Sequence, residues 1–168
     1  MRKLPLVGLV SGAILFVIDQ ATKYGITDVL GLNESSLGRD ITSFFTLRFV
    51  ANRGVSLGLL HADTEAMRWG LVVLTAAIAI GVLVWLLRER GRMDALALGA
   101  ILGGAIGNIA DRVRLGYVAD FLNLHFGAWS PFFVFNVADA AISIGVVLLA
   151  VRALFVRDAA PPSENANV

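Results

Sequence analysis

The sequence of 168 residues contains no cysteine, two histidines and only two lysines. Without cysteine there is no disulfide framework, no thiol nucleophile and no thiolate metal site. His61 and His125 stand alone, and the absence of a His-Glu-x-x-His motif disfavours a zinc protease. Lys3 lies at the N-terminus and Lys23 has no serine nearby, so a serine–lysine pair is disfavoured; a Gly-x-Ser-x-Gly elbow is also missing.

Charge is scarce as well. The net charge is +1 and the 14 Lys and Arg residues are thinly spread, which argues against a nucleic-acid partner. In contrast, 57% of the residues are hydrophobic and the mean hydropathy is +0.77, far above a soluble domain. This composition is typical of a membrane protein. We expect no metal and no cofactor.

Four apolar runs predict membrane spans, at about 4–24, 67–88, 94–113 and 132–152. The first run also fits a signal peptide, but no small-x-small cleavage site follows it, which favours an uncleaved span. The predicted fold is an all-α membrane protein with four transmembrane helices and a small β-sheet or hairpin. Residues 1–157 form one membrane domain, and we expect residues 158–168 to be a disordered cytoplasmic tail.

The long connection after the first span is polar and mixed. Within it, residues 45–49 alternate apolar and polar side chains as a half-buried strand does, and residues 52–54 predict a turn before residues 55–57. A small hairpin or sheet on the membrane surface is the expected product.

The cations indicate the orientation, because Lys and Arg in short loops collect on the cytoplasmic side. In a four-span topology seven cations lie on one side, at span ends and in short loops, so both termini are predicted to be cytoplasmic. The cations on that side are Arg2, Lys3, Arg88, Arg90, Arg92, Arg152 and Arg157. On the opposite side Arg39, Arg48 and Arg53 are diluted in a long loop, and Arg68, Arg112 and Arg114 lie at span ends.

Three spans each carry an aspartate toward the opposite side. With a rise of about 1.5 Å per residue, Asp19, Asp111 and Asp139 lie roughly 22, 25 and 18 Å from the cytoplasmic ends of their spans. An aspartate costs about 2.5 to 3.5 kcal/mol at the centre of a span, so three at one level suggest a shared site.

Asp120 follows the third span within residues 118–124, where apolar and polar residues alternate, so it can return to the membrane surface and face Asp139. Two carboxylates about 4 Å apart repel each other by about 4 kcal/mol at an effective dielectric near 20, so only one would ionise near neutrality. One acid and one base on either side of a water is how aspartic proteases hydrolyse peptides. The alternative is that both are surface acids, one in a loop and one at a helix start.

Other polar residues near these acids have simpler interpretations. Asp111 and Arg112 predict an ion pair that fixes the outer end of the third span. Asp19 and Lys23, at i and i+4, either pair locally or leave the lysine to extend toward the headgroups.

Small residues and amides predict close helix packing. Gly99, Gly103 and Gly107 have the small-xxx-small spacing, and no P-loop lysine with serine or threonine follows, which disfavours a phosphate loop. Asn108 and Asn136 either cross-link helices or contact substrate.

Taken together, these motifs resemble the bacterial lipoprotein signal peptidases, or signal peptidase II, over about residues 19–145. They occur in the family's order, and no single one would suffice. The motifs are Asp19-x-x-x-Lys23, Asn52-x-Gly54, Gly103-Gly104-x-x-Gly107-Asn108-x-x-Asp111-Arg112, Val118-x-Asp120-Phe121 and Phe135-Asn136-x-Ala138-Asp139.

The resemblance implies a four-helix aspartic endopeptidase of the bacterial inner membrane, with a small extracytoplasmic β-sheet or hairpin, a periplasmic loop or helix, and its site near the periplasmic face. Its substrates would be prolipoproteins cut just before a cysteine that carries diacylglycerol; membrane lipids and globomycin-type inhibitors would be its other partners. Asp120 and Asp139 match the catalytic pair. One departure is that Arg53 and Val55 stand where many relatives have small residues, which affects loop packing and substrate preference. The positions matching substrate, inhibitor or supporting roles are Asn52, Gly54, Asn108, Asp111, Arg112, Asn136, Asp19 and Lys23.

Two other classes of function are weighed against this one. A proton-coupled transporter would need acids at several depths, including the inner half of the membrane, and those are missing. A non-catalytic assembly factor held together by its glycine face would tolerate asparagine at both Asp120 and Asp139.

Overall fold

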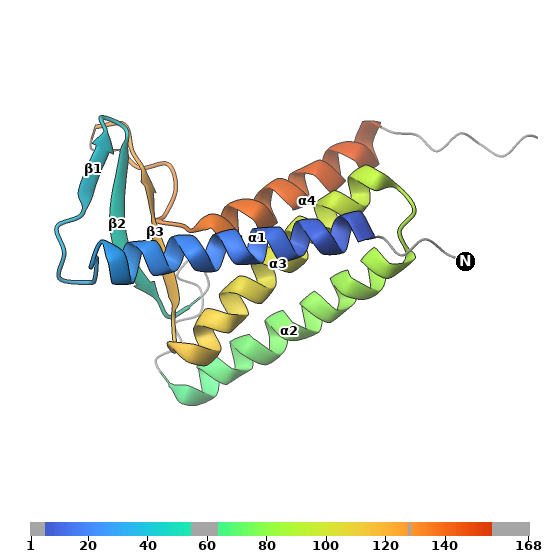
Figure 1. Ribbon diagram of the computed structural model, residues 1–168, viewed down its shortest axis with the longest axis horizontal. Helices are drawn as coiled ribbons and strands as arrows, with labels where there is room; N and C mark the ends of the chain where they lie inside the picture. The colour runs from blue at the N-terminus through green and yellow to red at the C-terminus, as the bar shows by residue number, and fades with distance from the viewer. Residues whose placement is uncertain (1–5, 55–63, 128, 156–168) are drawn as a thin grey trace, which may run out of the picture.

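The computed structural model describes residues 6–54, 64–127 and 129–155, and contains four long helices with a small sheet at one end (Figure 1). The helices are α1 (Leu6–Tyr24), α2 (Glu65–Arg88), α3 (Arg92–Arg114) and α4 (Val137–Phe155). All four are long and apolar enough to cross a membrane. The predicted four-helix membrane fold is therefore confirmed.

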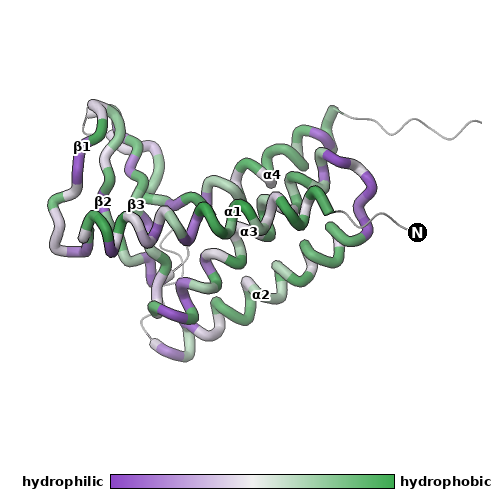
Figure 2. The backbone as a smooth tube through the Cα atoms, viewed as in Figure 1, coloured by the Kyte–Doolittle hydropathy of each residue, from purple (hydrophilic) through white to green (hydrophobic). Residues whose placement is uncertain are grey.

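Helix α3 is the centre of the bundle and packs against the other three helices (Figure 1). In its most apolar stretch 56% of residues are buried, against 17–22% in the other helices. The outer helices therefore turn apolar side chains outward, and Figure 2 shows hydrophobic residues along the helices with polar ones gathered at their ends. This is the pattern expected when lipid surrounds the bundle.

Glycines let α3 approach α1 and α4 closely. A Cβ atom at Gly103 would lie only 2.3 Å from the backbone oxygen of Gly12, and one at Gly104 would lie 2.5 Å from that of Ala138. Such distances require the absence of a side chain. The small-xxx-small prediction for the third span is confirmed at Gly103, and the close contact brings the polar ends of three helices together.

The sheet has three antiparallel strands in the order β1-β2-β3: Arg39–Thr42, Phe45–Asn52 and Val118–Leu124. The small extracytoplasmic sheet was expected, and the predicted strand at residues 45–49 lies within β2. The expected continuation at residues 55–57 and the tail at 158–168 lie outside the described residues.

Two helix boundaries differ from the predicted ones. The fourth span was expected from about residue 132, but α4 begins at Val137 because Phe135 pairs as an extended residue with Leu122 of β3. Hydropathy alone favours helix at residues 132–136, whereas the backbone of Phe135 bonds to β3. At the end of α1, a π-helical turn η1 (Gly25–Val29) occupies a segment that was expected to be loop.

Candidate active site

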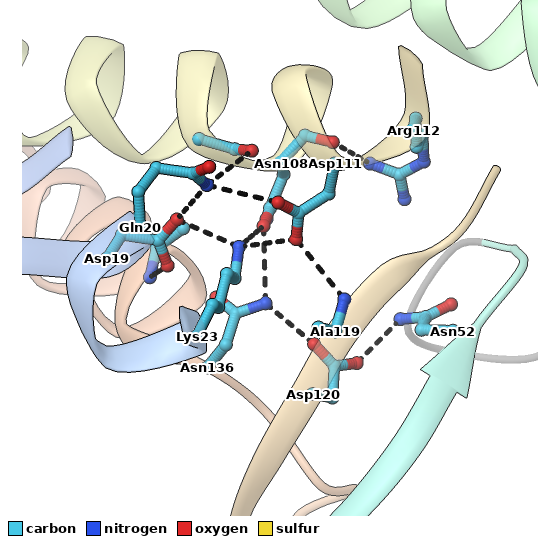
Figure 3. A network of polar contacts seen from close by, with 12 residues as sticks. Asp19, Gln20, Lys23, Asn52, Asn108, Asp111, Arg112, Ala119, Asp120 and Asn136 are labelled. Carbon is cyan, nitrogen blue, oxygen red and sulfur yellow. Dashed lines mark hydrogen bonds and ion pairs between the residues drawn. The ribbon is translucent and has the colours of Figure 1, made fainter. Parts of the chain in front are cut away.

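The polar ends of α1, α3 and α4 meet β3 in one buried network (Figure 3). One part of this network, the Lys23 cluster, consists of Lys23, Asp19 and Asp111. The ammonium of Lys23 lies 2.8 Å from a carboxylate oxygen of Asp19 and 2.8 Å from one of Asp111. All three residues are at most 5% exposed. Lys23 therefore pairs with two acids inside the protein and does not extend to the headgroups.

The expected ion pair between Asp111 and Arg112 is wrong. Asp111 takes Lys23 as its cation, and Arg112 donates instead to backbone oxygens, 2.9 Å from that of Gly54 and 3.5 Å from that of Asn108. The two side chains follow each other on α3, so they diverge around the helix. Arg112 thereby ties the end of the β2 segment to α3.

Each acid of the Lys23 cluster accepts a hydrogen bond from a backbone amide next to one of the two candidate catalytic residues. The N–H of Ala138 donates to Asp19 at 3.0 Å, and that of Ala119 donates to Asp111 at 3.2 Å. Ala138 directly precedes Asp139, and Ala119 directly precedes Asp120. The lysine and its two acids therefore fix the start of α4 relative to β3.

Gln20 also contacts the Lys23 cluster, and this role was not predicted from the sequence. Its amide nitrogen donates to Asp19 at 3.1 Å and to Asp111 at 3.0 Å, so it links the two acids beside the lysine. The available signal was an amide directly after Asp19 at the polar end of an apolar run. Gly107 makes room for this contact, since a Cβ there would lie 2.5 Å from Asp19 Oδ2.

Next to the Lys23 cluster, two asparagines connect Asp120 and Asp139 through hydrogen bonds. The side-chain amide of Asn136 donates to Asp120 Oδ1 at 2.6 Å and to Asn108 Oδ1 at 3.2 Å, and the amide of Asn108 donates to Asp139 Oδ1 at 2.8 Å. Asn52 donates to the other oxygen of Asp120 at 2.9 Å. Asn108 and Asn136 thus cross-link α3 to the start of α4 and connect both aspartates.

Asp139 is held by the first turn of its own helix. Its N–H donates to the side-chain oxygen of Asn136 at 2.9 Å, and its Oδ2 accepts from the N–H of Asn136 at 3.2 Å. This reciprocal arrangement is a capping box, which satisfies amide groups that have no partner at a helix start. The carboxylate is positioned by backbone geometry as well as by Asn108.

The two aspartates differ in their access. Asp120 is 1% exposed, whereas Asp139 is half-buried and lines a cavity of about 670 Å³. Aromatic side chains of the segment before α4, including Phe132 and Phe133, form another wall of this cavity, and apolar residues of α4 complete it. Of the two aspartates, only Asp139 lines this cavity.

The electrostatics favour a proton on this pair. The pKa of Asp120 is raised from 3.8 to about 7, first by burial and then by the charge of Asp139, while donation from Asn52 and Asn136 opposes the rise. The network holds four carboxylates and two cations. It would carry two net negative charges if every acid were ionised, and one shared proton halves that excess.

All ten residues singled out in the sequence lie in or beside this network. The structure brings together Asp19, Lys23, Asn52, Asn108, Asp111, Asp120, Asn136 and Asp139 by side-chain contacts, and Gly54 and Arg112 at its edge. Among the described residues, no group of three or more His, Cys, Asp or Glu is arranged to hold a metal ion.

Known proteins share both the sequence and the fold. The sequence profile of signal peptidase II matches residues 12–155. The lipoprotein signal peptidase of Rhizorhabdus wittichii is 55% identical over 92% of this chain and 90% of its own, and that of Sphingopyxis alaskensis is 48% identical over 91% and 88%. Two solved structures of bacterial membrane enzymes have the same fold, each with a TM-score of 0.75. They are 24% and 23% identical, covering 88% and 89% of this chain and 87% and 94% of theirs. The chain therefore belongs to the signal peptidase II family, the lipoprotein signal peptidases, and is a multi-pass membrane peptidase.

Proposed function

We propose that the chain removes signal peptides from prolipoproteins whose cysteine already carries diacylglycerol, and cuts just before that cysteine. The observation that carries this proposal is the pair Asp120 and Asp139, joined through Asn136 and Asn108 beside an apolar cavity. Membership of the family supports the substrate class. The cavity supports a substrate with apolar parts, since aromatic and aliphatic side chains form most of its wall.

The proposed chemistry is hydrolysis by an activated water without a covalent intermediate. The ionised aspartate takes a proton from water, and the resulting hydroxide adds to the carbonyl carbon before the lipidated cysteine. The protonated aspartate gives its proton to the carbonyl oxygen. The tetrahedral intermediate then collapses as the cysteine nitrogen leaves with a proton from one aspartate, while a hydroxyl of the intermediate returns its proton to the other aspartate. The raised pKa of Asp120 supports a shared proton near neutral pH.

The remaining network residues are proposed to position these two acids. Asn52, Asn108 and Asn136 donate to the carboxylates. Asp19 and Asp111, which share Lys23, accept directly from the adjacent backbone amides. Arg112 and Gly54 close the edge of the site, where they can contact substrate or a globomycin-type inhibitor.

The proposed location is the bacterial inner membrane with both termini in the cytoplasm. Arg88, Arg90, Arg92 and Arg152 lie at the end of the bundle away from the sheet (Figure 1). The positive-inside rule then assigns that end to the cytoplasm and the two aspartates to the periplasmic face.

The test uses purified protein in detergent and a synthetic prolipoprotein peptide with an S-diacylglyceryl cysteine. We expect mass spectrometry to find a product that begins with this cysteine, and the unlipidated peptide to be cut far more slowly. The Asp120→Asn variant, prepared in parallel, excludes a contaminating protease. Cleavage at another position, or equal rates for both peptides, would contradict the proposed substrate.

A further inference from the structure

A second cavity, of about 380 Å³, lies where α2 begins and α3 ends, beside the sheet (Figure 1). Two arginines, Arg53 and Arg68, line it together with Tyr117 and Gly116. Neither aspartate of the candidate active site lines this cavity.

Arg68 has a weak partner and an unsatisfied donor. Its guanidinium pairs with Glu65 at 3.0 Å, but the glutamate side chain is 74% exposed while that of Arg68 is 21% exposed. Exposed ion pairs contribute little, so this carboxylate is easily displaced. The Nε–H of Arg68 is buried and finds no acceptor among the described residues, which is a cost that a nearby anion would reduce.

Arg53 supplies a second positive charge. Its guanidinium lies 5.8 Å from the centre of the Tyr117 ring, and its contact with Glu34 is long, at 3.4 Å, between side chains that are both more than half exposed. The N-terminus of α2, which begins at Glu65, adds the positive end of a 24-residue helix dipole. The cavity thus combines two guanidinium groups with a helix start.

The depth of the cavity matches that of lipid headgroups. With 24 residues α2 is about 36 Å long, longer than the hydrocarbon core of about 30 Å. Its first turn therefore projects into the headgroup layer. Trp69 follows Arg68, lies 5.0 Å from its guanidinium and is 45% exposed, as expected of a residue at the membrane interface.

We propose that this cavity binds the phosphate group of an anionic phospholipid from the periplasmic leaflet. Arg53 and Arg68 would donate to the phosphate oxygens, since guanidinium groups match phosphate geometry. The phosphate would replace the carboxylate of Glu65 as the partner of Arg68, and the Glu65 side chain would turn to water. The acyl chains would run along the outward apolar face of α2. The site is separate from the proposed hydrolysis, so an Asp120→Asn variant binds the lipid as tightly as the unchanged protein.

The test measures lipid binding to delipidated protein in neutral detergent, by native mass spectrometry across a titration of dioleoyl phosphatidylglycerol. Each arginine near a charged membrane surface contributes about 1 kcal/mol, or about fivefold in affinity. We therefore expect Arg53→Gln and Arg68→Gln each to weaken binding about fivefold, and the double variant about 25-fold. Arg48→Gln, an exposed change of the same charge on β2, is the matched control and should leave binding unchanged.

Two further ligands identify the source of the phosphate. Dioleoylglycerol has the same chains without phosphate, and inorganic phosphate has no chains; both should bind at least tenfold more weakly than the phospholipid. Equal binding of dioleoylglycerol, or a double variant within twofold of the unchanged protein, would overturn the proposal. Equal binding of inorganic phosphate would overturn the lipid assignment. Arg53 is exposed, so Arg53→Gln keeps the test valid should Arg68→Gln not fold.

Discussion

Asn52 offers a direct way to shift the protonation of the proposed catalytic pair. Its amide donates to Asp120 Oδ2 at 2.9 Å, and this contact lowers the pKa of Asp120 against the rise caused by burial. Replacing Asn52 with alanine removes the donor, so the pKa of Asp120 should rise above about 7. A hydrogen bond to a charged group contributes about 1.5 to 3 kcal/mol. Because Asn52 is only half-buried, water replaces part of it, and we expect an upward shift of about one pH unit.

The assay is the pH dependence of kcat/KM for the lipidated peptide. The proposed chemistry requires one proton on the pair, so activity falls as pH rises through the pKa of Asp120. The midpoint of this alkaline limb should lie near pH 7 in the unchanged protein and about one unit higher in Asn52→Ala. Asn52 also accepts from the N–H of Gly54 at 3.0 Å, so the maximal rate can fall too; the midpoint is therefore the readout.

The matched control is Asn123→Ala, which removes an asparagine from β3 three residues beyond Asp120. It should leave the midpoint unchanged. An alkaline limb that stays in place or moves to lower pH in Asn52→Ala would refute the assignment of this limb to Asp120.

Further predictions concern stability. Because the pKa of Asp120 is raised in the folded protein, the contribution of this residue to stability is fully present below about pH 4 and is lost, by on the order of 4 kcal/mol, as pH rises through about 7. Asp120→Asn should therefore be more stable than the unchanged protein at pH 8, with the advantage fading toward pH 4, in denaturant titrations in detergent. Lys23→Met leaves two buried carboxylates without their cation and should cost about 3 to 5 kcal/mol in the same titrations; a loss below 1 kcal/mol would contradict the buried pairing. Gly103→Ala places a Cβ 2.3 Å from a backbone oxygen of Gly12 and should cost about 1 to 3 kcal/mol, whereas Gly81→Ala, with nothing within 4 Å, should be neutral or slightly stabilising.

The fold was largely predictable because lipid imposes a simple rule on sequence. Each helix that crosses the membrane needs about 20 apolar residues, so four such runs predict four spans. The segment before α4 escaped this rule. Residues 132–136 are mostly apolar, but Phe135 pairs with Leu122 in the sheet, and hydropathy does not distinguish an apolar extended segment from a helix.

The sequence predicted which residues form the site better than it predicted which of them contact each other. The motifs named the acids and amides, but charge alone does not say which acid meets which base. Asp111 stands next to Arg112 in sequence, yet it pairs with Lys23 from a different helix. Gln20 was missed for the same reason, because its role depends on two acids that the fold, and not the sequence, brings beside it.

The central claim is that Asp120 and Asp139 act as one unit on a single water. The most direct measurement is a double-mutant cycle on the single-turnover cleavage rate, with Asp120→Asn, Asp139→Asn and the combined variant, each verified as folded. The effects of groups that act as one unit do not multiply. Each single variant should therefore cleave at least about a thousandfold more slowly than the unchanged protein, and the double variant should be no slower than the single variants. Single variants that keep a tenth or more of the rate, or losses that multiply in the double variant, would contradict the account.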